Sequence, residues 1–407
     1  MKKLCHVSNY TDRKVLYFIN VFFSFFLRLF YKSRSNSIWI FGCWLGKRYD
    51  DNSRYLFEYI LKYHPEIEAI WVTRNNTIYS LLKSENKPVV LDKSFAGKKT
   101  MMRAGVALYT NGLDDFSSVP LVYGAKLIHL SHAAAGIKKS GFEKNNYKNS
   151  FIKQFMKRIK DFLFDWYSFD MNIATSKESR ISHASTYGYY REKKIQITGL
   201  PRNDLLVHPN LFQSIKPSFM IDEFKYILYL PTYRPYKNNV IRDAVAHFIS
   251  DVNLNKTLQK KGYKIVVKLH PEDFCELEGN DNIVILDNDF IGSTQELLRW
   301  SCCLITDYSS CCMDFSLKRE PVFIFAPDYN EYNLYNGIVD LWLDVYNSRK
   351  VIKNVNNLTS VIIDFCENTY ISNFDLSDWI NHNYESSDIS NTVYCENVIK
   401  KVKSMFI

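Results

Sequence analysis

The sequence predicts an α/β fold of two doubly wound parallel sheets that face each other across a cleft. Short apolar segments alternate with segments of helical periodicity along the chain, a pattern typical of parallel strands joined by covering helices. A turn-rich stretch at 205–222, which contains two prolines and two serines, lacks clear periodicity and is the expected linker. The length of 407 residues suits two domains of ordinary size. We therefore expect two Rossmann-like domains, at 35–210 and 211–407.

Seven strands are predicted before the linker and five after it. The first group is 37–41, 70–73, 89–91, 106–110, 127–130, 172–175 and 195–198, and the second is 226–230, 264–268, 283–286, 303–306 and 322–325. Asn52 and Ser53 are suited to cap a helix in which apolar residues recur from Tyr55 to Ile60. The part after about residue 350 is mainly helical, and we expect it to pack back across the domain junction.

Two aromatic segments are candidates for contact with a membrane surface. Residues 15–27 are apolar but shorter than the roughly 20 residues needed to cross a bilayer, and basic residues flank them. We interpret residues 1–34 as an interfacial, membrane-associating segment, with a helix packed on the domain as the alternative. Residues 151–166 combine an aromatic stripe with lysines and an arginine, which suits either an anionic membrane or core packing.

Composition restricts the class of partner. A net charge of +9 favours an anionic partner, such as a nucleotide, a phosphorylated polymer or a membrane surface. No zinc-finger spacing or RNA-binding strand motif supports nucleic acid, so we expect none. The nine cysteines lack metal-ligand spacing with histidines, and a reduced compartment is the simpler interpretation. We expect neither a metal nor another cofactor.

Polar residues follow three of the predicted strands of the second domain. They are the Asp-Tyr-Ser-Ser of 307–310, the Lys-Leu-His-Pro of 268–271 and the Pro-Thr-Tyr-Arg-Pro of 231–235. In open α/β sheets, ligands bind beyond the carboxyl ends of the strands, and hydroxyl groups before a helix suit phosphate. These segments indicate a pocket for a nucleotide diphosphate.

With these motifs in place, the chain resembles the CDP-glycerol glycerophosphotransferase family, the teichoic acid and capsule polyol-phosphate polymerases. The resemblance covers roughly residues 37–345. It rests on an ordered series of segments at 38–42, 46–56, 64–67, 199–204, 231–234, 269–271 and 305–310, followed by Asp314, Phe315, Pro321 and Asp328.

The resemblance implies a GT-B-like transferase that moves a polyol phosphate, most simply glycerol phosphate, from a CDP-activated donor to an acceptor hydroxyl and releases CMP. It implies a lipid-linked or glycan acceptor polymer and a peripheral location on the cytoplasmic face of the membrane. The family's two essential histidines correspond to His132 and His270. Around His132 the family's Gly-Thr is replaced by Ala133 and Ala134, which leaves the identity of the donor open.

The candidate site residues have distinct expected roles. His132 is the candidate general base, and His129, inside the apolar run, is a competitor with a more structural character. His270, Ser309 and Ser310 are assigned to the donor diphosphate, and Arg234 to a phosphate clamp. Asp307 is expected to orient His270 or hold a ribose hydroxyl. Lys138 is expected to attract the donor, and Arg202 to pair with Asp204 or the interdomain surface.

Two other functions compete with this hypothesis. One is a GT-B glycosyltransferase that uses a nucleotide sugar, with Ala133 and Ala134 marking the different donor. The other is a non-catalytic protein of a capsule-assembly complex.

Overall fold

The computed structural model describes residues 34–116, 121–122, 124–141, 169–213, 215–234, 236, 239–269, 277–286, 290, 292–369, 375–384 and 391–407. The two predicted aromatic segments, 15–27 and 151–166, and the histidine at 270 lie outside these residues. Within the described part, no helix is long and apolar enough to cross a membrane.

The first sheet has seven strands, all parallel, in the order β3-β2-β1-β4-β5-β6-β7. Its strands are β1 (Ser35–Phe41), β2 (Glu68–Thr73), β3 (Val89–Leu91), β4 (Ala104–Tyr109), β5 (Lys126–His129), β6 (Met171–Ala174) and β7 (Ile195–Ile197). Its helices are α2 (Asp51–Tyr63), α3 (Asn76–Ser84), α4 (Phe95–Arg103) and α6 (Lys177–Tyr187). The strand order reverses between β1 and β4, and this reversal point is where such sheets bind ligands.

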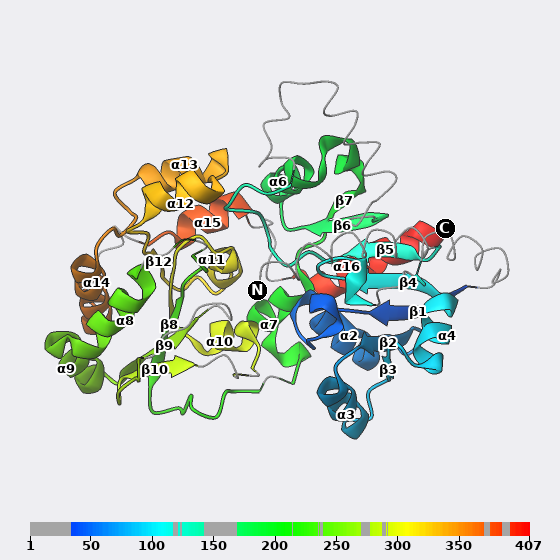
Figure 1. The fold of residues 1–407 in the computed structure, drawn as a ribbon, viewed down its shortest axis with the longest axis horizontal. Helices are drawn as coiled ribbons and strands as arrows, with labels where there is room; N and C mark the ends of the chain where they lie inside the picture. The colour runs from blue at the N-terminus through cyan, green and yellow to red at the C-terminus, as the bar shows by residue number, and fades with distance from the viewer. Residues whose placement is uncertain are drawn as a thin grey trace, which may run out of the picture.

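The second sheet has five parallel strands in the order β10-β9-β8-β11-β12, which repeats the start of the first order. Its strands are β8 (Lys225–Leu230), β9 (Tyr263–Lys268), β10 (Ile283–Leu286), β11 (Cys303–Thr306) and β12 (Val322–Ile324). Its helices are α8 (Val240–Ser250), α9 (Val252–Lys261), α10 (Thr294–Trp300), α11 (Cys311–Ser316), α12 (Tyr329–Asn336), α13 (Asp340–Asn347), α14 (Val355–Glu367) and α15 (Ser377–Tyr384). The predicted α/β fold of two doubly wound parallel sheets is confirmed, and the sheets occupy separate lobes (Figure 1).

The strands are buried because apolar side chains fill both of their faces. Every residue of β4 is buried, as are all four residues of β6 and of β11. Strands covered on both faces read as continuous apolar runs, which is why sequence periodicity located them to within two residues. One local prediction is wrong. Asn52 and Ser53 do not cap α2, which begins at Asp51; the Ser53 hydroxyl instead donates to the Gly42 carbonyl beyond β1 (2.8 Å).

The junction contains a short connection and a helix that returns from the end of the chain. A 3₁₀ turn at Pro201–Asn203 leads into α7 (Asp204–Val207), and α16 (Tyr394–Lys403) packs against α2 in the first lobe (Figure 1). The Asp204 carboxylate accepts the first backbone N–H groups of α16, at Tyr394 and Cys395 (both 2.8 Å). Gly199, at φ +76°, allows the approach, because a Cβ there would lie 2.0 Å from the Tyr394 ring. The division at 210/211 stays a prediction.

Candidate active site

The turn after β1, residues 43–47, has an unusual backbone. Trp44, Leu45 and Gly46 have φ values of 45°, 59° and 70°, a left-handed run that costs energy for residues with side chains. The buried Asp115 carboxylate holds the turn, since its Oδ1 accepts the Leu45 N–H (2.6 Å). Its Oδ2 accepts the backbone N–H of Thr110, after β4, at 2.9 Å. A buried carboxylate thus connects the ends of β1 and β4, the reversal point of the sheet.

The loop after β5, residues 130–136, carries His132 and is called the His132 loop. Ser131 also has a positive φ of 52°, and the Asn52 amide donates to the carbonyls of Leu130 (3.0 Å) and Ser131 (2.8 Å). The His132 side chain is exposed to solvent, with the Trp44 ring 6.1 Å from it between centroids. Although the residue reaches solvent, the protein packed around its imidazole partly desolvates the ring and lowers the pKa of His132, and the Asp51 carboxylate opposes this shift. Near neutral pH the imidazole is therefore mainly neutral and able to accept a proton.

His129 occupies a different environment from His132. It is buried, and its Nε2 lies 2.7 Å from the Thr110 carbonyl oxygen. Burial lowers its pKa to about 3, and burial lowers the pKa of the neighbouring His183 to about 4. This environment fits the structural role expected for His129.

At the edge of the second sheet, Arg234 is buried in a network of ion pairs. Its guanidinium donates to both carboxylate oxygens of Asp328 (2.7 and 3.0 Å), to Asp307 (2.7 Å) and to the Thr232 carbonyl (2.6 Å). It also lies over the ring of Tyr308, 4.9 Å from the centroid. These contacts commit four N–H donor positions of Arg234 to protein acceptors. The expected role of Arg234 as a phosphate clamp stays a prediction.

Asp307 is likewise occupied by protein groups. Its carboxylate accepts the backbone N–H of Thr232 (2.9 Å) and of Tyr308 (2.6 Å) in addition to the Arg234 contact. These contacts link the turn after β8 to the turn after β11. The expected role of Asp307, to orient His270 or hold a ribose hydroxyl, stays a prediction.

The remaining predicted donor residues lie around the two sheet edges. Ser309 and Ser310 are partly exposed after β11, and the Ser309 hydroxyl accepts the Cys311 N–H (3.4 Å). Lys138 is exposed just after the His132 loop, and its charge contributes to lowering the pKa of His132. His270 lies outside the described residues, so its role stays a prediction.

Two further cations, Arg48 and Lys268, interact across the domain junction, and sequence reasoning did not predict this interaction. Lys268 ends β9, and its pKa is lowered by burial and then by the charge of Arg48, which follows the turn after β1. The Asp50 carboxylate opposes the shift. Arg48 belongs to a segment of the family resemblance, and Lys268 to the Lys-Leu-His-Pro segment that follows a predicted strand, so their charge and position were the available signal.

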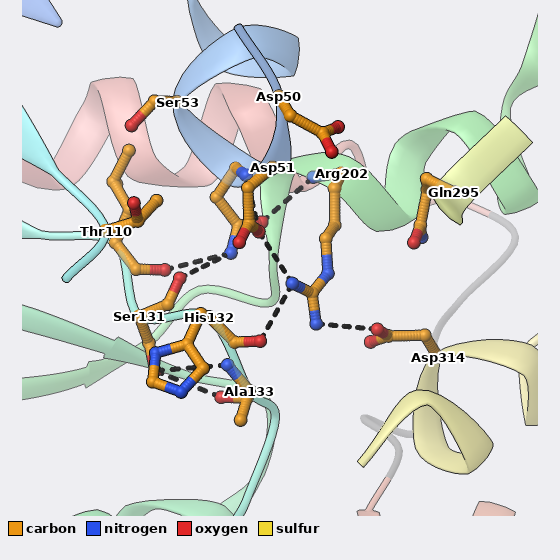
Figure 2. Close-up of polar contacts among 12 residues, drawn as sticks. Asp50, Asp51, Ser53, Thr110, Ser131, His132, Ala133, Arg202, Gln295 and Asp314 are labelled. Carbon is orange, nitrogen blue, oxygen red and sulfur yellow. Dashed lines mark hydrogen bonds and ion pairs between the residues drawn. The ribbon is translucent and has the colours of Figure 1, made fainter. Parts of the chain in front are cut away.

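Arg202 connects the two domains beside the His132 loop (Figure 2). Its Nη1 donates to Asp51 Oδ1 (2.6 Å) and to the His132 carbonyl (2.9 Å), and its Nη2 donates to Asp314 Oδ2 (2.6 Å). The predicted interdomain position is therefore correct. The alternative, pairing with Asp204, is wrong because Asp204 binds α16.

The described residues hold no group of three or more histidine, cysteine or acidic side chains placed to bind a metal. Three acidic side chains near the sheet edge of the first domain are bound to protein groups. Asp115 holds backbone N–H groups, and Asp50 and Asp51 accept from Ser293 (2.8 Å) and Arg202.

The chain has two parallel sheets that share the order of five strands. His132 lies at the edge of the first sheet, and Ser309, Ser310 and Lys268 lie at the edge of the second. This arrangement is that of a GT-B-like transferase. The sequence pattern of one such family, CDP-Glycerol:Poly(glycerophosphate) glycerophosphotransferase, matches residues 21–388. The chain belongs to this family.

Named relatives agree with this family. The chain is 24% identical over 343 residues to the teichoic acid poly(glycerol phosphate) polymerase of Staphylococcus epidermidis, covering 78% of this chain and 46% of that protein. It is 25% identical over 346 residues to the teichoic acid glycerol-phosphate transferase of Staphylococcus aureus, covering 82% and 81%. The chain thus spans about half of the first relative and most of the second.

A solved structure shows the same fold. The wall teichoic acid polymerase TagF superposes with a TM-score of 0.67 at 19% identity, over 98% of this chain and 99% of that one.

Proposed function

We propose that this protein transfers glycerol phosphate from CDP-glycerol to a hydroxyl group of a growing teichoic acid chain. The acceptor oxygen forms a bond to the phosphorus that carries glycerol, the P–O–P bond breaks, and CMP leaves with the bonding electron pair. His132 takes the proton of the acceptor hydroxyl. The observation that carries the proposal is the exposed, mainly neutral His132 imidazole at one sheet edge of a chain that belongs to this family.

The donor diphosphate would bind between the two edges. Among the described residues, Arg48 is close enough to Lys268 for its charge to lower the pKa of Lys268, and the Asp50 carboxylate opposes this shift. An anionic diphosphate would relieve the repulsion between these two cations, and cations preorganised around a phosphate stabilise the charge that develops during transfer. We assign Ser309, Ser310 and Lys138 to the same ligand, with Arg234 and Asp307 shaping its pocket. His270, as predicted from the resemblance, would contact the leaving phosphate.

The replacement of Gly-Thr by Ala133 and Ala134 is compatible with this activity. Neither alanine has a positive φ, whereas Ser131, just before them, does. Ala134 is buried, and its carbonyl accepts the Ser179 hydroxyl. The loop is therefore built so that no glycine is required at 133 or 134, and the substitution gives no reason to change the donor class.

The acceptor and the location of the protein are further parts of the proposal. A lipid-linked acceptor would bring the site to the cytoplasmic membrane surface, and residues 1–34 would provide the interfacial contact. Deleting residues 1–34 should move the protein from membrane to soluble fractions while donor affinity is kept. A capsule polymer remains an alternative acceptor.

The test combines thermal stability with CMP release. CDP-glycerol and CMP should raise the melting temperature more than UMP or UDP-sugars do, because a ligand that binds only the native state stabilises it by about 2.7 kcal/mol at one hundred times its Kd. CMP should be released when acceptor is present. Equal or larger shifts with UDP-sugars would support the glycosyltransferase, and CMP binding without release would support the non-catalytic protein. Selective release from CDP-ribitol would correct the polyol.

A further inference from the structure

The Arg202 guanidinium binds three parts of the molecule whose relative positions matter for the proposed reaction. Arg202 binds Asp51 at the start of α2, the His132 carbonyl in the His132 loop, and Asp314 in α11 of the second domain (Figure 2). The helix α11 begins directly after Ser309 and Ser310. A single side chain therefore lies between the backbone of the candidate base and the helix that follows the candidate donor hydroxyls.

Neighbouring amides extend this connection on both sides. The Arg202 backbone N–H donates to the Asn52 side-chain oxygen (3.1 Å). The Asn52 amide nitrogen in turn donates to the carbonyls of Leu130 and Ser131. On the other side, Asn203 donates to Asp314 Oδ1 (3.0 Å) and accepts from Gln295 at the start of α10 (2.9 Å). Both ends of the connection are thus held by hydrogen bonds as well as by charge.

Burial makes the arrangement stiff. The side chains of Arg202, Asp51 and Asp314 are 10%, 6% and 2% exposed. Buried ion pairs give little net stability over well-packed apolar groups, because desolvation offsets their attraction, but they do impose a geometry. The planar fork of arginine reaches several acceptors in fixed directions, which a lysine ammonium does not. The arrangement is therefore better suited to position groups than to stabilise the fold.

We propose that Arg202 is a positioning residue that holds His132 at a fixed distance from the donor subsite by bridging the His132 carbonyl to Asp314 across the domain junction. The inference rests on the proposed function, because it assigns Arg202 to the same reaction. Arg202 itself touches no reacting atom. It acts through the backbone of the base on one side and through α11 on the other.

The experiment compares Arg202→Lys and Asp314→Asn with Asp204→Asn as a matched control. Asp204 is a buried carboxylate of the same junction that binds α16 and not the His132 loop. A displacement of about 1 Å between reacting groups costs on the order of 10²-fold in rate. Arg202→Lys and Asp314→Asn should therefore lower kcat about 10²-fold while KM for CDP-glycerol changes less than about threefold. Asp204→Asn should lower the melting temperature and keep kcat.

A double-mutant cycle tests the bridge itself. Once Asp314→Asn has weakened the bridge, adding Arg202→Lys should cost much less than it does alone. Independent, additive losses would overturn the proposal, as would wild-type kcat in either folded variant or an equal kcat loss in Asp204→Asn. If Arg202→Lys does not fold, Asp314→Asn, which keeps the shape of the side chain, decides the outcome.

A readout without turnover separates this inference from the proposed function. The ring resonance of His132, assigned by its loss in His132→Gln, should move in Arg202→Lys and Asp314→Asn but not in Asp204→Asn. If the wild-type protein releases no CMP from CDP-glycerol, the proposed function fails and this resonance still tests the bridge. An unchanged His132 resonance in both variants would overturn it.

Discussion

The two domains share the order of five strands, but Arg234 at one sheet edge and His132 at the other lie in contrasting environments. In the second domain, Arg234 and its two carboxylates are buried and paired, and the guanidinium lies over the Tyr308 ring. In the first, His132 is exposed and Trp44 and Leu45 have strained backbones. A satisfied ion cluster resists movement, whereas an exposed imidazole is available to a substrate. We call the buried cluster of Arg234, Asp307 and Asp328 the frame. In the proposed function, the edge of the first domain provides the proton acceptor.

Removing the imidazole is the strongest test of this contrast. His132→Ala should lower CMP release on the order of 10²–10⁴-fold, the usual effect of losing a general base, with donor affinity largely unchanged. Calorimetry with CMP and a coupled assay measure the two quantities. His64→Gln is the control, since His64 binds Glu66 and Glu396 away from either edge. Turnover close to wild type in His132→Ala would remove it as the base.

The complementary histidine, His270, should give a different result. Its predicted contact is with the donor diphosphate, so His270→Ala should weaken CMP binding as well as turnover. The same calorimetric titration decides the matter, and unchanged affinity would show that His270 does not contact the diphosphate.

Removing Arg234 from the cluster with Asp307 and Asp328 should lower the free energy of unfolding. Arg234→Met leaves Asp307 and Asp328 buried without their cation, and removing one partner of a buried ion pair typically costs about 3–5 kcal/mol in the free energy of unfolding. Urea denaturation measures the loss. Arg180→Met is the matched control, because its pair with Glu192 is more than one third exposed and should contribute at most about 1 kcal/mol. Equal losses in both variants would contradict the division into frame and reactive edge.

The buried histidines of the first domain should make it sensitive to acid. Burial lowers the pKa of His183 to about 4, whereas in the unfolded chain it is about 6.5, so the folded state binds fewer protons between these values. Stability from this group is thus full above about pH 6.5 and is lost as pH falls toward 4, by about 2 kcal/mol at pH 5. In His183→Gln, the difference in unfolding free energy between pH 7 and pH 5 should shrink by that amount. An identical pH dependence in the two proteins would show that folding does not lower the pKa of His183.

The smallest effect concerns the strained turn. Leu45 is 46% exposed and has a φ of 59°, so Leu45→Gly removes backbone strain and little packing. After the entropic cost of glycine, we expect a gain of about 0.5–1 kcal/mol in unfolding free energy. Leu45→Ala keeps the strain and should show no gain. A gain in both variants would assign the effect to the side chain.

The limits of the strands could be predicted from the sequence, whereas the pairing of polar side chains could not. Runs such as 303–306 are apolar on both faces, so their limits could be read directly, and polar residues placed after them were correctly put at the sheet edges. Which polar group pairs with which depends on distant segments. Asp328, which comes after β12, accepts two hydrogen bonds from Arg234. No residue near Arg234 in the sequence indicates this pairing. The Arg48–Lys268 approach was missed for the same reason, because it joins two domains.

The return of α16 has a consequence for how the chain is made. The apolar face of this helix, which includes Val398, Ile399 and Val402, is buried, and the helix packs on α2 of the first lobe. During synthesis the first domain emerges long before residues 394–403, so until the last part of this sequence is released it exposes the surface that α16 will cover. Domains generally fold as units in the order of synthesis. Here the domain that is synthesised first is the one whose packing is completed last.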